Sequence, residues 1–245
     1  MLPPPQPISL LYKSLQKFVT LDITWLMTLE AKDLRAKRTP GDVALRRLSE
    51  QDVRSHSLLP DYQLAAEDAD RLRRASHECL AAFVDNQLAA YAWYAFEGVA
   101  AKLNRGADDA SGVALTYPRS MVFLYKGFTH PKFQARGLIG LIQQHALRTF
   151  NSRGINTLLS TAEWNDKKEL ENHQRVGFRP VGRIFVAGAA GETVLKVTAD
   201  AKAIDVRAGK SISELRARSS KRCDPIAQTR SDGRDATPRR TAQSA

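Results

Sequence analysis

Apolar residues alternate with polar ones, or run continuously, over short stretches of the chain, and this pattern predicts alternating strands and helices. The clearest stretch is VFLYKGFT at 122–129, whose β-branched and aromatic residues indicate a strand. A basic loop at 134–137 follows His130-Pro131 and leads into a predicted helix at 141–150. The same pattern predicts further strands at 43–48, 78–84, 87–96, 155–164, 179–186 and 192–197. It predicts further helices at 49–58, 61–75 and 165–176.

The segment before this region reads as helical. Between residues 9 and 36, leucines recur near helical spacing with lysines between them, although Thr20 and Asp22 weaken the middle. We therefore expect two short helices there. An amphipathic basic helix can bind a membrane or a partner protein, but packing on the body of the protein is the simpler interpretation.

These patterns divide the chain into three parts. Residues 1–40 form a predicted helical extension, residues 41–199 a single α/β domain, and residues 200–245 a basic tail without a folding pattern. Within the domain, residues 102–118 are rich in Gly, Asp and Ser and read as a surface loop. A loop of this length between strands is either functional, for example by contacting a substrate, or a harmless insertion.

Composition places the chain among ordinary globular proteins, with one unusual feature. The net charge is +11, and residues 200–245 contribute +5 of it from eleven Lys/Arg and six Asp/Glu. The two cysteines and the histidines have no zinc-binding spacing, so no metal site is predicted. The N-terminus lacks the apolar core of a signal peptide, and the apolar segment 18–29 is too short to span a membrane, so we expect a cytoplasmic protein.

The strand at 122–129, the loop and the following helix together predict an anion site. The first N–H groups of a helix have no acceptor within the helix, and the helix dipole places partial positive charge there. Lys132 and Arg136 add full charges, and Gly137 permits the turn. A pyrophosphate group is the kind of ligand that such a turn binds.

The residues around this turn resemble a motif of the GNAT family, the GCN5-related N-acetyltransferases. The acetyl-CoA loop of that family reads hydrophobic-His-Pro-x-aromatic-(Gln/Arg)-x-x-Gly-x-(Gly/Ala), and this chain has THPKFQARGLI at 129–139. A second family pattern, an Asn and a short helix followed by Gly-Phe, is matched by Asn165 and Gly177-Phe178. The resemblance covers about residues 43–197. The chain departs from the family at Ile139, where a small residue is usual, and at His173, where a Tyr is usual.

The resemblance implies an α/β (α+β) fold, the GNAT acyl-CoA N-acyltransferase fold, with helices on both faces of a mixed central sheet that splays between two parallel strands. Acetyl-CoA, the co-substrate, would lie between those strands, with its pyrophosphate on backbone N–H groups of the loop. Ile139 is expected to point into the core instead of crowding the phosphates. The residues implied for cofactor binding are Phe128, Thr129, Gln134, Ala135, Arg136, Gly137, Leu138, Ile139, Gly140 and Asn165.

The resemblance also implies direct transfer of an acyl group from a CoA thioester to an amine. Its catalytic candidates are His173, as the acid that protonates the leaving thiolate, and Glu163, as a base near the acceptor. Each residue has an alternative role: His173 can simply pack against its helix, and Asn165 can be an ordinary helix N-cap. His130 precedes the loop and is expected to be structural.

Three functions remain open from the sequence. The first is an acyl-CoA-dependent N-acyltransferase that acts on a small-molecule or peptide amine. The second is a catalytically degenerate CoA-binding or interaction module, which the departures at Ile139 and His173 favour. The third is a nucleic-acid-associated protein that uses the basic tail, although the tail lacks aromatic residues for stacking on bases. The acceptor and the oligomeric state cannot be read from the sequence.

Overall fold

The computed structural model describes residues 6–15, 20–34, 38–104, 113–189, 192–198, 200–201, 204–209 and 212–213. Its helices are α1 (Gln6–Leu15), α2 (Glu50–Ser57), α3 (Ala66–Leu72), α4 (Leu138–Asn151) and α5 (Lys167–Val176). Its strands are β1 (Thr20–Glu30), β2 (Val43–Arg47), β3 (His77–Val84), β4 (Gln87–Phe96), β5 (Ala114–Thr116), β6 (Met121–Thr129), β7 (Thr157–Glu163), β8 (Arg179–Ala189), β9 (Glu192–Val197) and β10 (Arg207–Gly209). Four short 3₁₀ turns join some of them, at Ala31–Asp33, Pro60–Tyr62, Ala101–Leu103 and Pro131–Phe133.

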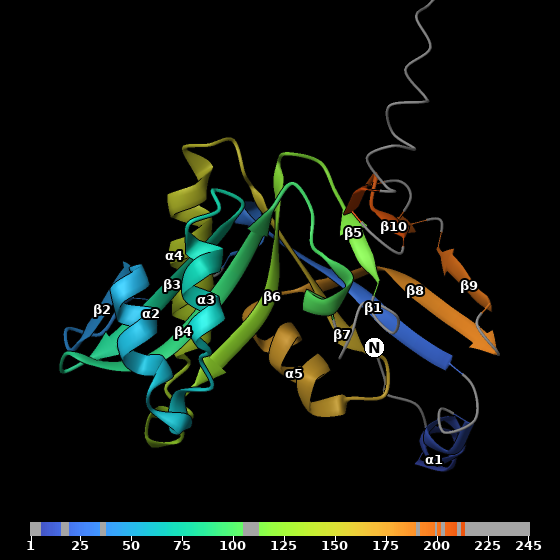
Figure 1. The fold of residues 1–245 in the computed structure, drawn as a ribbon, viewed down its shortest axis with the longest axis horizontal. Helices are drawn as coiled ribbons and strands as arrows, with labels where there is room; N and C mark the ends of the chain where they lie inside the picture. The colour runs from blue at the N-terminus through green and yellow to red at the C-terminus, as the bar shows by residue number, and fades with distance from the viewer. Residues whose placement is uncertain are drawn as a thin grey trace, which may run out of the picture.

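Eight strands form one twisted sheet in the order β2-β3-β4-β6-β7-β1-β8-β9 (Figure 1). Neighbours pair antiparallel except β6 and β7, which are parallel. The hairpin between β3 and β4 turns at Asp85 and Asn86, whose φ values of 48° and 62° are those of a left-handed turn. The predicted mixed sheet is therefore confirmed, but one of its central strands, β1, lies before the domain predicted at 41–199.

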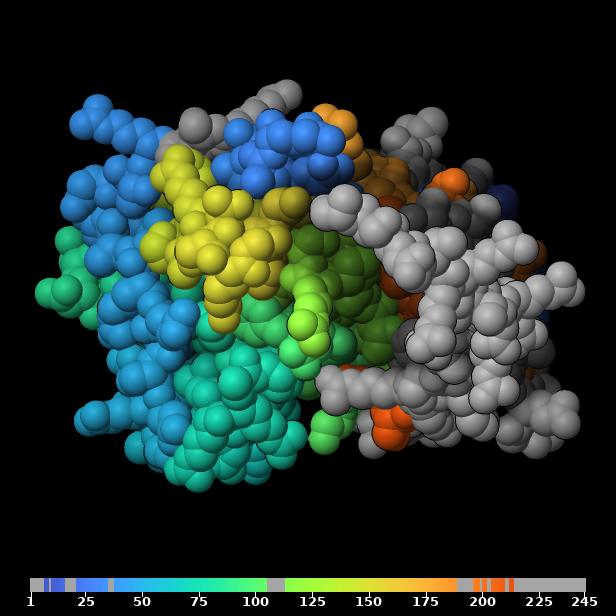
Figure 2. All heavy atoms as spheres, turned by 90° about the horizontal axis from the view of Figure 1, so that it is seen from above, coloured from blue at the N-terminus to red at the C-terminus, as the bar shows by residue number. Residues whose placement is uncertain are grey.

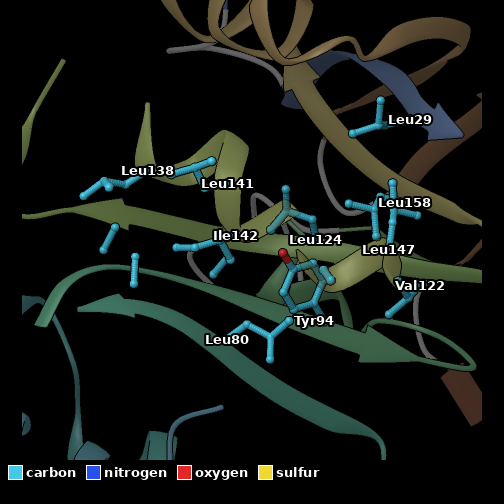
Figure 3. Packing of buried hydrophobic residues seen from close by; sticks show 14 of the residues in the cluster. Leu29, Leu80, Tyr94, Val122, Leu124, Leu138, Leu141, Ile142, Leu147 and Leu158 are labelled. Carbon is cyan, nitrogen blue, oxygen red and sulfur yellow. The ribbon is translucent and has the colours of Figure 1, made fainter. Parts of the chain in front are cut away.

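Both faces of the sheet are buried, and successive residues of β3 show this. Leu80 and Ala82 pack in the core beneath α4, whereas Cys79 and Ala81 pack in the core beneath α2 and α3. Figure 3 shows the first core, where side chains of α4 lie close to those of the sheet; the labelled residues include Leu138, Leu141, Ile142, Leu147, Tyr94, Leu124 and Leu158. The predicted helices on both faces are confirmed.

The prediction of two helices between residues 9 and 36 is wrong in its second half. The first half contains α1, but Thr20–Glu30 is β1, a central strand that pairs with β7 on one edge and β8 on the other. Leu26 packs on one face of the sheet, and Met27 and Leu29 pack on the other. A strand buried on both faces carries a near-continuous apolar run, which periodicity alone does not distinguish from a buried helix.

Among the described side chains of helix α1, Tyr12 is the buried one. Its hydroxyl accepts a hydrogen bond from the Ile23 N–H at 3.0 Å, and its ring meets the ring of Trp164 edge-on. Burial raises the pKa of Tyr12 to about 12. The expected packing of the apolar face on the body is thus only partly found, because α1 leaves four apolar side chains exposed: Ile8, Leu10, Leu11 and Leu15.

Two further boundaries differ from the prediction. The helix predicted at 61–75 is shorter, since Gln63 takes a left-handed φ of 52° and α3 begins only at Ala66. The tail predicted from residue 200 includes β10, which pairs antiparallel with β5 inside the predicted 102–118 loop. Ala201 and Val206 pack with this pair in a third core region. Residues 105–112 of the loop and 214–245 of the tail lie outside the described residues.

No helix in the described part of the chain is long and apolar enough to cross a membrane. The C-terminal end of α4 (yellow) reaches the surface in the view from above (Figure 2), where residues 151–154 are exposed. The opposite, N-terminal end of α4 adjoins the loop that the sequence singled out as an anion site.

Candidate functional site

The parallel strands β6 and β7 pair over less than half the length of β6. Met121–Leu124 pairs with Thr157–Ser160, and beyond these residues the two strands separate (Figure 1). On its other edge β6 stays paired with β4 as far as Thr129, with a register shift at Trp93/Tyr94. Among the described strands, none pairs with residues 125–129 on the β7 side. The backbone of this stretch can therefore pair with an extended ligand.

The loop after β6 is fixed at its start by His130. The side chain of His130 is buried, and its Nδ1 accepts from the Lys132 N–H at 3.3 Å. The backbone N–H of the same residue donates to the Ala89 carbonyl at 2.9 Å. Its Nδ1 is thus engaged by the loop backbone. The expected structural role of His130 is confirmed.

The next residues form an exposed turn, whose first N–H, that of Gln134, donates to the Pro131 carbonyl at 3.3 Å. Ala135 and Gly137 have left-handed φ values of 64° and 69°, with extended backbone at Gln134. Helix α4 then begins at Leu138 with no side-chain cap from Gly137 and no acidic residue in its first turn. Left-handed residues of this kind turn successive N–H groups toward one side, which is how backbone forms anion sites. Residues 134–137 are exposed, so an anion can reach them.

The charges around the turn are arranged differently from the prediction. The Arg136 guanidinium donates to the Asp42 carboxylate at 2.5 Å and thereby lowers the pKa of Asp42. Because this ion pair links the loop to the turn before β2, part of the charge of Arg136 is neutralised. Lys132 is exposed beside the loop. The backbone and the helix dipole therefore provide most of the attraction for an anion.

Ile139, the departure from the family motif, points toward the sheet. Its side chain is half-buried and packs against the main core. Its Cδ1 lies 3.7 Å from the position that a Cβ on Gly127 of β6 would occupy. The absence of a side chain at Gly127 thus leaves room for the branched side chain of Ile139, and the expectation that Ile139 points into the core is confirmed.

His173 lies at the point where β6 and β7 separate. Its Nδ1 is 2.9 Å from the Glu169 carbonyl of its own helix, and its Nε2 is 3.1 Å from Ser160 Oγ on β7. The Ser160 hydroxyl in turn lies 3.1 Å from the carbonyl of Leu124, the last residue of β6 that pairs with β7. The sequence did not single out Ser160; its only signal was a small polar residue within an apolar strand.

Glu163 and Asn165 lie at the C-terminal end of β7. Glu163 is the last residue of the strand, pairs with Thr24 of β1, and donates its backbone N–H to Glu169 Oε2 at 3.1 Å. Asn165 follows in the turn before α5. The N-cap of α5 is Asp166, whose carboxylate accepts from the Glu169 N–H at 2.8 Å, so Asn165 is not that cap.

The order of the elements, the separation of β6 from β7 and the turn into α4 are those that the resemblance implies. The chain has the GNAT fold. Solved structures of acetyltransferases are among those similar to it, and the names of two of them give the GCN5-related or GNAT family. No family model matches the sequence, and no curated protein matches it.

Three solved structures give the extent of the similarity. A GCN5-related N-acetyltransferase from Kribbella flavida is 15% identical with a TM-score of 0.49, over 75% of this chain and 65% of that one. A ribosomal-protein-alanine N-acetyltransferase from Brucella melitensis biovar Abortus is 13% identical with a TM-score of 0.39, over 54% and 89%. An aminoglycoside N-acetyltransferase in complex with CoA is 18% identical with a TM-score of 0.41, over 56% and 91%. The present chain thus spans less than two thirds of the Kribbella protein.

Proposed function

We propose that this protein is an acyl-CoA-dependent N-acyltransferase that transfers an acetyl group from acetyl-CoA to an amine. The observation that carries the proposal is the combination of a β6 edge at 125–129, which no described strand pairs on the β7 side, with a left-handed turn at the N-terminus of α4. The edge suits the amide groups of an extended pantetheine arm, and the turn suits a pyrophosphate at its end.

The residues proposed to hold acetyl-CoA are those of the loop and the two strand ends. Backbone N–H groups of 135–140 would bind the pyrophosphate, with Gln134 beside it. Phe128 and Thr129 would bind the arm, and Asn165 would bind it from the β7 side. Because the donors are backbone groups, the outward side chains need only leave the approach open. The orientation of Ile139 toward Gly127 supports this requirement.

The bound thioester would supply an acyl group activated toward attack by a neutral amine. Glu163, at the end of β7, is the proposed base that takes a proton from the acceptor amine. His173, at the point of separation, is the proposed source of the proton for the leaving sulfur. The acceptor belongs to the class of small-molecule or peptide amines, and a cytoplasmic location is part of the same proposal.

Thermal unfolding in the presence of acetyl-CoA tests the proposal. A ligand that binds only the native state at about 100 times its Kd stabilises it by about 2.7 kcal/mol. For a domain of this size we expect the Tm to rise by about 5–10 °C. Pantetheine, which lacks the pyrophosphate, is the matched control and should raise the Tm much less. An unchanged Tm at millimolar acetyl-CoA would contradict the proposal.

A further inference from the structure

A chain of three hydrogen-bond contacts crosses the point where β6 and β7 separate. It runs from the Glu169 carbonyl to His173 Nδ1 at 2.9 Å, then from His173 Nε2 to Ser160 Oγ at 3.1 Å. The third contact joins Ser160 Oγ to the Leu124 carbonyl at 3.1 Å. Both ends of the chain are backbone carbonyls, which can only accept.

The number of protons in this chain depends on His173. A neutral imidazole and a hydroxyl supply two protons for three contacts, whereas an imidazolium and a hydroxyl supply three. In the neutral state Nδ1 must carry the proton, because otherwise two lone pairs would face each other at 2.9 Å between Nδ1 and the Glu169 carbonyl. Nε2 is then an acceptor, and the Ser160 hydroxyl is the donor in contact with it.

We propose that Ser160 positions His173 and relays its proton: the Ser160 hydroxyl donates to His173 when the imidazole is neutral and to the Leu124 carbonyl when it is protonated. The inference rests on the proposed N-acyltransferase function for its role in a reaction. The arrangement itself depends only on the residues of this chain.

The surroundings of the pair favour a relay over free exchange with water. Ser160 is 4% exposed, while His173 is half-buried, with its ring edge-on to Phe178. Besides His173, the helix α5 carries five charged side chains, and β7 ends in Glu163. The five on α5 are Lys167, Lys168, Glu169, Glu171 and Arg175. The Glu169 carboxylate is bonded by the backbone N–H of Glu163. The Leu124 position of β6 contributes only a backbone carbonyl.

The relay delivers one proton from His173 to the sulfur by two linked proton transfers. The Oγ–H bond of Ser160 breaks as its proton passes to the leaving sulfur between the strands. The Nε2–H bond of His173 breaks at the same time, and its proton forms a new Oγ–H bond on Ser160. The imidazole ends neutral with its proton on Nδ1, and its Nε2 again accepts from Ser160.

Nitrogen NMR of the imidazole, with His173→Gln used to assign its signals, tests the arrangement without any ligand. We expect the neutral form of His173 to carry its proton on Nδ1. Ser160→Ala should shift the Nε2 resonance and leave the Nδ1 resonance in place, because only the Ser160 contact is lost. The matched control is Thr161→Val, which removes the next hydroxyl of β7, a donor to Asn104 Oδ1 at 2.8 Å. That control should move neither resonance.

A second measurement, the rate of thiol release from acetyl-CoA, tests the relay. We expect Ser160→Ala to lower the rate by about 100-fold, the lower end of the 10²- to 10⁴-fold that an acid–base group typically contributes. Ser160→Thr, which keeps the hydroxyl, should restore most of it. Acetyl-CoA should still raise the Tm of Ser160→Ala as it does for the unmodified protein.

The outcomes separate this inference from the proposed function. A neutral His173 with its proton on Nε2, an Nε2 resonance that Ser160→Ala leaves unchanged, or full thiol release by Ser160→Ala would each overturn the relay. If acetyl-CoA binding and release both fail in the unmodified protein while the Nδ1 proton is found, the enzyme proposal fails and the arrangement of Ser160 and His173 stands.

Discussion

Replacing Gly137 by Asp is expected to weaken acetyl-CoA binding by about 100-fold and to leave the fold intact. The left-handed backbone of Gly137, with φ 69° and ψ 22°, is one that Asp also adopts at small cost. A carboxylate there would occupy the N-cap of α4 and bind the N–H groups that the pyrophosphate needs. It would also repel a phosphate charge about 5 Å away by about 3 kcal/mol at an effective dielectric constant of about 20.

The matched control is Gly137→Asn, which has the same shape and backbone tolerance without the charge. We expect calorimetry with acetyl-CoA to give Gly137→Asn a Kd within about tenfold of that of the unmodified protein. The loss of affinity for acetyl-CoA in Gly137→Asp should be much larger. The Tm of this variant without ligand should equal that of the unmodified protein or be higher, because an acid at a helix N-terminus is stabilising. Equal affinities for the two variants would contradict an anion site at this turn.

The second large effect concerns β1. We expect Leu29→Ala to lower the free energy of unfolding by about 2–5 kcal/mol, because Leu29 is fully buried in the core shared with α4 and α5. Its Cδ1 also lies 3.3 Å from the position that a Cβ on Gly177 would take, so the cavity left by the substitution would adjoin the end of α5. Urea unfolding followed by circular dichroism measures the change.

Leu11→Ala in α1 is the matched control, since the same pattern of leucines predicted a helix for both residues. Leu11 is 62% exposed, and its truncation is expected to change the free energy of unfolding by less than about 0.5 kcal/mol. Similar losses in the two variants would mean that the N-terminal segment packs as one unit, contrary to a central strand preceded by a lightly attached helix.

Local signals predicted the part of the fold that surrounds the site. The run at 122–129, the glycine-bearing turn and the amphipathic helix after it each depend on residues close in sequence, and the structure contains all three. The strands predicted at 78–84 and 87–96 are local in the same sense, since only Asp85 and Asn86 separate them. The helix predicted at 49–58 is also local, since the Ser49 hydroxyl caps α2 by accepting from the Asp52 N–H at 3.1 Å.

The pattern of apolar and polar residues did not predict which strands pair when they are far apart in the sequence. The apolar run of β1 fits a helix until its partners are known, and those partners, β7 and β8, lie more than 100 residues away. The pairing of β10 with β5 joins a presumed tail to a presumed loop. Ser160 was missed for the same reason, because only the packing of α5 on β7 brings it to His173.

The measurement that tests the central claim most directly is an amide NMR titration with acetyl-CoA. The account predicts that the largest shifts fall on the N–H groups of 134–140 and on β6 from Tyr125 to Thr129, with smaller ones near Ser160 and Asn165. In Gly137→Asp these shifts should need about 100-fold more acetyl-CoA. Saturable shifts that leave residues 134–140 unchanged, or no shifts at millimolar acetyl-CoA, would contradict it.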